Sequence, residues 1–276
     1  MANAMTDRRS LLRLAKALLD LERDPVGILR LSDRSDRSDR SKAERLGAAL
    51  PHTALYFCSA VTLASKGKSF TLYREHVRCP AARRVLGYEE AREAEELACE
   101  YASYGTYENE DVARAVIVEQ TARIDGETHG VTQALTLAPL SRYFEQGLEP
   151  DAATFVSSPH AIMRLIQGYA YSHGAVDSLS VAGMHGMCSE SFARAYVAQG
   201  PSVSFLCSGA RHFGMFAEKE LAITFPGKAL ESVLQGVAAT ADACEDDARK
   251  ERIARRLAAS GIDFPLTYRG SYIYRE

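Results

Sequence analysis

An internal repeat constrains the fold of this chain more than any other feature of its sequence. Two separate segments carry the same ordered signals: a Cys-Ser pair, a short helical stretch, a glycine, an extended run and a second cysteine in a C-x-x-A-R motif. The cysteines of the two segments are 21 and 19 residues apart, and they are Cys58, Cys79, Cys188 and Cys207. A repeated order of this kind predicts two related structural units.

A further match follows each segment. An apolar run leads through a proline to a helical stretch that ends in Gln-Gly, over residues 134–147 in the first case and 222–236 in the second. Three matches in the same order predict a first repeat at residues 24–147 and a second at residues 150–236. We expect the two diverged copies to pack about a pseudo-twofold axis.

Strand and helix signals alternate within both repeats, which predicts an α/β fold with a mixed or parallel sheet. An insertion at residues 89–128, rich in Glu, Ala and Tyr, is predicted to be helical and to cover the site or a partner surface. Leucines at helical spacing predict an N-terminal helix within residues 5–23. A charged amphipathic stretch predicts a C-terminal helix and tail at residues 237–276, with an edge strand from Phe264 to Tyr274.

The segment at residues 32–41 has no large apolar side chain to bury. Residues 32–41 contain three Ser-Asp-Arg triplets, and low-complexity polar runs of this kind do not supply a packed core. We therefore predict a solvated loop there.

Composition narrows the class of protein. With 46% hydrophobic residues, 25% charged residues and a net charge of -3, the chain has an ordinary globular composition and no electrostatic footprint for nucleic acid. No apolar run predicts a membrane span and no secretory signal pattern is found, so we expect a cytoplasmic protein. In that setting six cysteines indicate buried thiols, metal ligands or redox chemistry rather than a disulfide scaffold.

Several runs together resemble a known family. They are 56–61, 79–82, 150–153 with Ser158-Pro159, and 207–211. These runs are similar to domain-of-unknown-function family 169, over about residues 24–237. The family has no established reaction, so the resemblance implies the domain limits and the cysteine pattern only.

The four repeat cysteines each follow an extended or apolar segment and precede an expected helix start. Amide groups and the helix dipole at an N-terminus stabilise a thiolate, which predicts lowered cysteine pKa values. Four thiolates gathered at a pseudo-twofold interface would suit an iron–sulfur cluster first, with zinc as the alternative. The competing interpretation is that cysteine fills small buried positions after strands. Cys99 and Cys244 have no counterpart in the repeat, and we expect neither to be a ligand.

Charged side chains near the cysteines suggest further roles. Arg83 and Arg211 end the two C-x-x-A-R motifs, where they could offset thiolate charge and bind an anionic substrate, or form a salt bridge within each copy. His185 and His212 occur in the second copy only. Histidine there could act as acid and base, complete a metal site, ligate haem, or serve only the fold.

These features predict a metal- or iron-sulfur-dependent oxidoreductase or lyase that acts on a small molecule, an anion being compatible with the arginines. The alternatives are a non-catalytic metalloprotein, with structural zinc or a redox-sensing cluster, and a haem-binding protein. The expected partners are the small-molecule substrate and either a redox partner or a second copy of the chain, with neither nucleic acid nor membrane.

Overall fold

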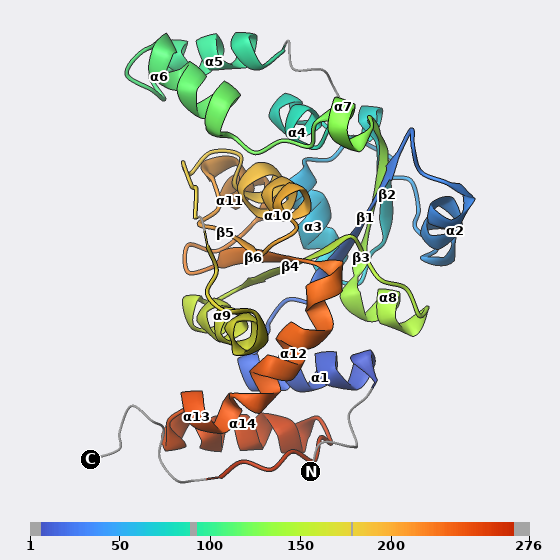
Figure 1. Cartoon of the computed structure of the whole chain (residues 1–276), viewed down its shortest axis with the longest axis vertical. Helices are drawn as coiled ribbons and strands as arrows, with labels where there is room; N and C mark the ends of the chain where they lie inside the picture. The colour runs from blue at the N-terminus through green and yellow to red at the C-terminus, as the bar shows by residue number, and fades with distance from the viewer. Residues whose placement is uncertain (1–6, 89–92, 178, 268–276) are drawn as a thin grey trace.

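A computed structural model describes residues 7–88, 93–177 and 179–267 of the chain (Figure 1). Within these residues the strands form one six-stranded antiparallel sheet in the order β2-β3-β1-β4-β6-β5. The strands are β1 (Val26–Ser32), β2 (Phe70–Tyr73), β3 (Thr132–Pro139), β4 (Ala152–Ser157), β5 (Ser202–Ser204) and β6 (Leu221–Pro226).

Helices surround the sheet. They are α1 (Arg8–Leu19), α2 (Arg37–Arg45), α3 (Phe57–Ser65), α4 (Pro80–Val85), α5 (Glu93–Ser103), α6 (Glu110–Arg114), α7 (Gly126–His129), α8 (Leu140–Glu145), α9 (Pro159–His173), α10 (Arg194–Ala198), α11 (Ser208–Gly214), α12 (Leu230–Ala239), α13 (Ala241–Cys244) and α14 (Asp247–Ala259). Short 3₁₀ turns are η1 (Arg74–His76) and η4 (Gly227–Ala229), and π-helical turns are η2 (Ala115–Gln120) and η3 (Gly186–Ala193).

The predicted α/β class is confirmed, but the prediction of a mixed or parallel sheet is wrong. β1 and β2 do run in the same direction, because each pairs antiparallel with β3, which lies between them. In the same way β6 lies between β4 and β5. Each strand–helix–strand connection therefore leaves a gap of one strand, and a third strand fills that gap antiparallel to both neighbours.

The sheet is buried on both faces. Alternate residues of a strand point to opposite faces, so Ile28 packs in one apolar core and Leu29 in the other. One core is formed with α1, α8, α9 and α12, and the other with α3, α4, η3 and α11. The second core contains Cys188, with Cys58, Cys79 and Cys207 packed against it. The fold therefore brings the repeat cysteines to one side of the sheet.

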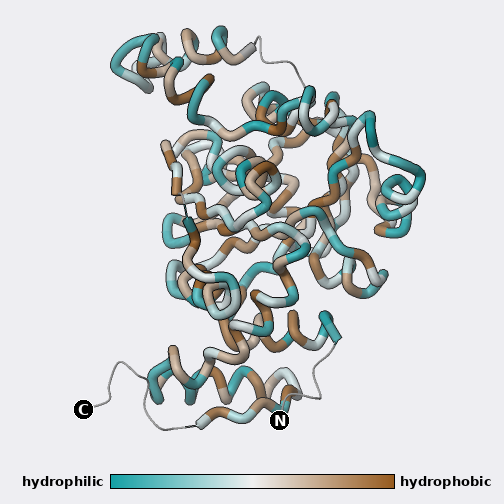
Figure 2. The backbone as a smooth tube through the Cα atoms, in the orientation of Figure 1, coloured by the Kyte–Doolittle hydropathy of each residue, from teal (hydrophilic) through white to brown (hydrophobic). Residues whose placement is uncertain are grey.

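The prediction of a loop at residues 32–41 is wrong for its second half, because α2 begins at Arg37. The side chain of Asp36 caps this helix by accepting hydrogen bonds from the amides of Ser38 and Asp39. Asp39 then pairs with Lys42 at 2.8 Å, one turn along the helix. Figure 2 shows that α2 is hydrophilic along its length, so capping and local pairs support it rather than a large buried face.

The remaining helices extend beyond the two ends of the sheet. α5 and α6 lie together above α4 with a small apolar cluster of their own (Figure 1). At the opposite end, α14 packs against α1, which buries the leucine face expected from its sequence. Residues 264–267 form no strand, contrary to the predicted edge strand, and the rest of that prediction lies outside the described residues. No described helix has the length and hydropathy needed to cross a membrane.

Candidate functional site

The four repeat cysteines line one pocket of about 260 Å³. They come from four segments that are far apart in the sequence, at the starts of α3, α4, η3 and α11. Aromatic, methionine and small residues form most of the remaining wall, with His185, Tyr101 and Ser208 as its polar members. Cys99 and Cys244 do not line this pocket. The fold thus gathers the cysteines of the repeat and leaves the other two outside.

The two C-x-x-A-R cysteines occupy the same position at the start of a helix. Cys79 is the N-cap of α4, where Pro80 occupies the first turn, and Cys207 is the N-cap of α11. The Cys207 sulfur accepts a hydrogen bond from the amide of Ala210 at 3.4 Å. This bond to a free amide of the first turn orients the Cys207 sulfur, whereas the Cys79 side chain makes no cap hydrogen bond.

The predicted lowering of cysteine pKa values is not what the folded protein shows. Burial raises the pKa of Cys58 to about 12, and neighbouring Cys207 and Cys79 add to the effect. Burial also raises the pKa of Cys79, although the amides of Ala82 and Ala81 oppose it. For Cys188, which is 8% exposed, burial holds the pKa well above the ordinary value. Desolvation outweighs the helix N-terminus, so these three side chains are neutral thiols in the protein by itself.

The thiols lie around the pocket wall rather than in a closed shell. Among the described residues no group of three or more His, Cys, Asp or Glu side chains is placed to hold a metal ion. All six cysteines are free thiols. A ligand in this pocket would therefore have to bridge the sulfurs or draw them inward.

The two candidate histidines have different surroundings. His185 lines the pocket, is 5% exposed and lies with its Nε2 3.3 Å from the Tyr101 hydroxyl. Its Nδ1 has no hydrogen-bond partner in the described part of the chain. Burial, together with the charge of Arg84, lowers the pKa of His185 to about 4, so the ring is neutral at pH 7. His212 is exposed on α11 beside Phe213 and does not line the pocket.

The two candidate arginines lie outside the cysteine pocket, although Arg83 interacts electrostatically with Cys79. Arg211 donates hydrogen bonds to the backbone carbonyls of Ala217, Phe205 and Glu220, which fixes the turn after α11. Arg83 lines a separate hollow between α4 and α5. Neither side chain lines the cysteine pocket.

Arg84 and Tyr101 are neighbours of the cysteines that the sequence did not single out. Arg84 is 2% exposed, interacts electrostatically with Cys188 and Tyr101, and donates one hydrogen bond to the Ile117 carbonyl. Its Nε and Nη1 have no hydrogen-bond partner among the described residues. Helical spacing could have found it, because Arg84 shares the buried face of α4 with Ala81. Tyr101 comes from α5 in the insertion, and no local signal predicts that contact.

Stacked aromatic rings form part of the pocket lining at a partly exposed edge. Tyr56 and Phe213 stack with ring centroids 3.7 Å apart and an interplanar angle of 6°. The guanidinium carbon of Arg78 lies over the Tyr56 ring, 5.5 Å from its centroid. Phe213 is 40% exposed, so this stack borders both the pocket and solvent.

Comparison with known proteins gives a family but no named relative. The model of family DUF169, described as uncharacterised ArCR, matches residues 15–236 of the 276-residue chain. The match includes all four pocket cysteines and ends before α13 and α14. No curated protein and no solved structure matches the chain.

Proposed function

This chain belongs to the uncharacterised DUF169 family, and we propose that its four repeat cysteines bind one metal cofactor, with an iron–sulfur cluster as the first choice. One observation carries the proposal: four cysteines from four distant segments line a single pocket. Thiolates are soft ligands that suit iron–sulfur clusters and zinc. Three of the four thiols are neutral in the protein by itself, so cofactor binding would displace their protons.

The size and spacing of the site favour a cluster over the alternatives. Tetrahedral zinc, with Zn–S bonds of about 2.3 Å, would draw four sulfurs to about 3.8 Å from one another. The described side chains are not gathered in that way. A cluster places its own iron and sulfide atoms between the thiolates, so it suits a wider ring of sulfurs. Haem fits least well, because about 260 Å³ is below the range of about 300–1,000 Å³ for pockets that hold drug-sized ligands.

The proposal includes two diverged repeats related by a pseudo-twofold axis. The strand order β2-β3-β1 in one half is mirrored by β5-β6-β4 in the other, with β1 antiparallel to β4 at the centre. A twofold axis between β1 and β4 would exchange every strand with its counterpart. It would also exchange Cys79 with Cys207, which have the same N-cap position on α4 and α11.

Arg84, which interacts electrostatically with Cys188, is the main residue we assign to charge compensation, and Arg83, which interacts with Cys79, would add to it. A centre ligated by several thiolates brings negative charge into a buried site, and an unpaired buried charge costs several kcal/mol. Within the described part of the chain, Arg84 is itself a buried cation with a single hydrogen bond, to a carbonyl. The two charges would stabilise one another.

We propose oxidoreductase or lyase activity on a small molecule that reaches the centre past the Tyr56–Phe213 stack. The neutral His185, whose Nδ1 has no hydrogen-bond partner among the described residues, would bind the substrate or the cofactor rather than donate a proton at neutral pH. A catalytic role for His212 stays a prediction, since its side chain lies outside the pocket. We propose the cytoplasm, where thiols stay reduced, as the compartment for this chemistry.

One observation favours a second function. The pocket wall offers a substrate few polar groups beyond His185, Tyr101 and Ser208. An enzyme site usually adds convergent polar groups to an apolar pocket, whereas an electron-transfer or redox-sensing centre does not need them. The alternative is therefore a non-catalytic metalloprotein that works with a redox partner or a second copy of the chain.

Single serine variants test whether the four thiols share one cofactor. Cys58→Ser, Cys79→Ser, Cys188→Ser and Cys207→Ser should each lower the metal content of anaerobically purified protein, because every ligand lost unpairs the others. Cys99→Ser and Cys244→Ser are matched controls that should keep it. Full metal content in all four pocket variants would contradict the proposal.

A further inference from the structure

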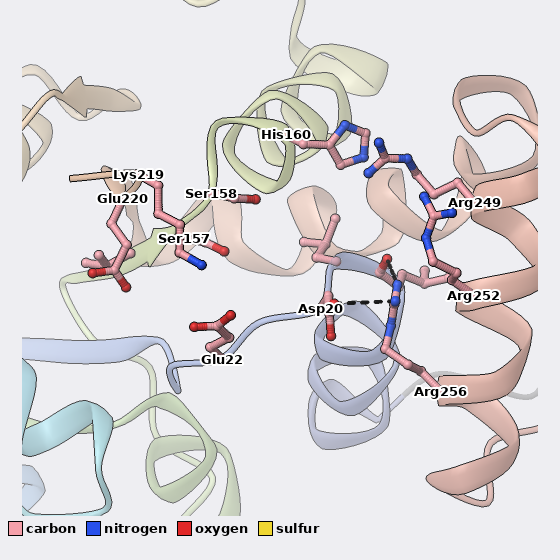
Figure 3. Close-up of a pocket in the computed structure, with 13 residues that line it drawn as sticks. Asp20, Glu22, Ser157, Ser158, His160, Lys219, Glu220, Arg249, Arg252 and Arg256 are labelled. Atoms are coloured by element: carbon pink, nitrogen blue, oxygen red, sulfur yellow. Dashed lines mark hydrogen bonds and ion pairs between the residues drawn. The ribbon is translucent and has the colours of Figure 1, made fainter. Parts of the chain in front are cut away.

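A second hollow lies on the other side of the molecule from α5 and α6 and shares no lining residue with the cysteine pocket. It has a volume of about 210 Å³ and is formed by the end of α1, the end of β4, the start of α9, the segment before β6, and α14 (Figure 3). The family match ends at residue 236, so α14 adds to this hollow a wall that the family model does not cover.

Three arginines of α14 face the hollow. Arg249, Arg252 and Arg256 follow one another at intervals of three and four residues, which places them on one side of the helix. Figure 3 shows them on the α14 side of the hollow, across from Glu22 and Lys219. The first turn of α9 adds the positive end of a 15-residue helix, capped by Ser158.

Two of these arginines have structural partners. Arg256 donates hydrogen bonds to the carbonyls of Ala17 and Leu18 at the end of α1, and it pairs with Asp20 at 3.5 Å. The Nε atom of Arg249 lies 3.4 Å from Oε2 of Glu245. The same buried carboxylate pairs with Arg164 at 2.9 Å, so Glu245 balances two guanidinium groups with one negative charge. The local network thus carries surplus positive charge.

The other two cations form no ion pair among the described residues, although Lys219 interacts electrostatically with Glu220, which pairs with Arg23. Arg252 donates only to the Ala248 carbonyl of its own helix, and no carboxylate pairs with Arg252 or Lys219 among the described residues. Glu22 is the one lining carboxylate without a cationic partner in that part of the chain. The whole chain has a net charge of -3, so positive charge at this hollow is a local feature.

We propose that this hollow is a binding site for a small phosphate-bearing molecule that also carries a hydroxyl group. The phosphate lies between Arg252 and Lys219, whose charged donors come from two elements, and the positive end of α9 adds to the field at the site. The hydroxyl donates to Glu22, which a bare anion would leave unpaired. A hollow of about 210 Å³ limits the ligand to a few carbon atoms. The site is independent of the cysteine pocket and of its cofactor.

Titration calorimetry with inorganic phosphate and with glycerol 3-phosphate tests the site. We expect both to bind, with glycerol 3-phosphate the tighter because only it offers a donor to Glu22. Arg252→Met should weaken both by about tenfold or more, the effect of losing one charge-assisted contact. Arg255→Met is the matched control, because Arg255 is exposed on the same helix and does not line the hollow. Glu22→Gln should remove the preference for glycerol 3-phosphate.

Three results would overturn the proposal. If neither compound binds at millimolar concentration, the site itself is refuted. If Arg252→Met and Arg255→Met weaken binding equally, the binding reflects general surface charge and not a specific site. Equally tight binding of acetate or citrate would refute phosphate as the ligand class. Thermal unfolding without ligand checks that the variants fold, and metal content need not change in any of them.

Discussion

The pH dependence of stability distinguishes a buried neutral thiol at Cys188 from the thiolate that the sequence predicts. Burial holds the pKa of Cys188 well above 9.0 in the folded protein, while the unfolded chain titrates near the ordinary value. The buried neutral thiol therefore makes its full contribution to stability below about pH 9. That contribution is lost as the pH rises further, because the unfolded chain then releases the proton and the folded chain keeps it. The metal-free protein should therefore lose stability from about pH 9 upward.

The slope of this loss follows from proton linkage. Above about pH 9 the unfolded state has released the Cys188 proton and the folded state keeps it, so the free energy of unfolding falls by about 1.4 kcal/mol per pH unit for this one thiol. Tyrosines and lysines also titrate in this range, so the informative quantity is the difference between wild type and Cys188→Ser. Urea unfolding of metal-free protein at about pH 8.5, 9.5 and 10.5 measures this difference.

Cys188→Ser should have a shallower fall than the wild type by about that amount. Cys99→Ser controls for the loss of one thiol, because Cys99 is exposed. Identical slopes in wild type and Cys188→Ser would refute the reasoning, since Cys188 would then titrate alike in the folded and unfolded states. A steeper fall in the variant would also contradict it.

Two further predictions concern other buried ionisable groups. Burial lowers the pKa of His185 to about 4, so the protein should lose stability as the pH falls from about 6.5 to 4, because only the unfolded chain then takes up the proton. In acid titrations His185→Gln should remove this loss, and His212→Gln, at an exposed position, should not. Arg164→Met should lower the free energy of unfolding by about 3–5 kcal/mol, because it leaves the buried Glu245 without its closest cation; Arg249→Met, which removes a partner 35% exposed, should cost no more than about 1 kcal/mol in the same urea experiment.

The cysteine pocket was accessible to sequence analysis because its signal is local and repeated. Each C-x-x-A-R motif starts a helix, and Cys79 and Cys207 directly precede α4 and α11 as predicted. Their pKa values were not accessible in the same way. A helix start can be recognised from neighbouring residues, but desolvation depends on the residues that the fold packs around each sulfur.

Contacts between distant segments account for the rest of what was missed. The antiparallel sheet results from β3 and β6 entering between strands that precede them, which alternating strand and helix signals do not specify. Tyr101 reaches His185 across 84 residues of sequence. The helix α2 escaped prediction for a different reason: an Asp36 cap supports a stretch whose composition is typical of a loop.

The cofactor content of the protein purified without oxygen tests the central claim most directly. Iron, zinc and acid-labile sulfide are measured per chain, together with the absorption spectrum. We expect iron and sulfide in comparable amounts and the brown colour of a cluster, both lost when the four pocket cysteines are replaced together. Colourless protein with one zinc per chain would favour the structural alternative. Protein that holds neither iron nor zinc, even after anaerobic reconstitution with iron and sulfide, would contradict the claim that these four cysteines form a metal site.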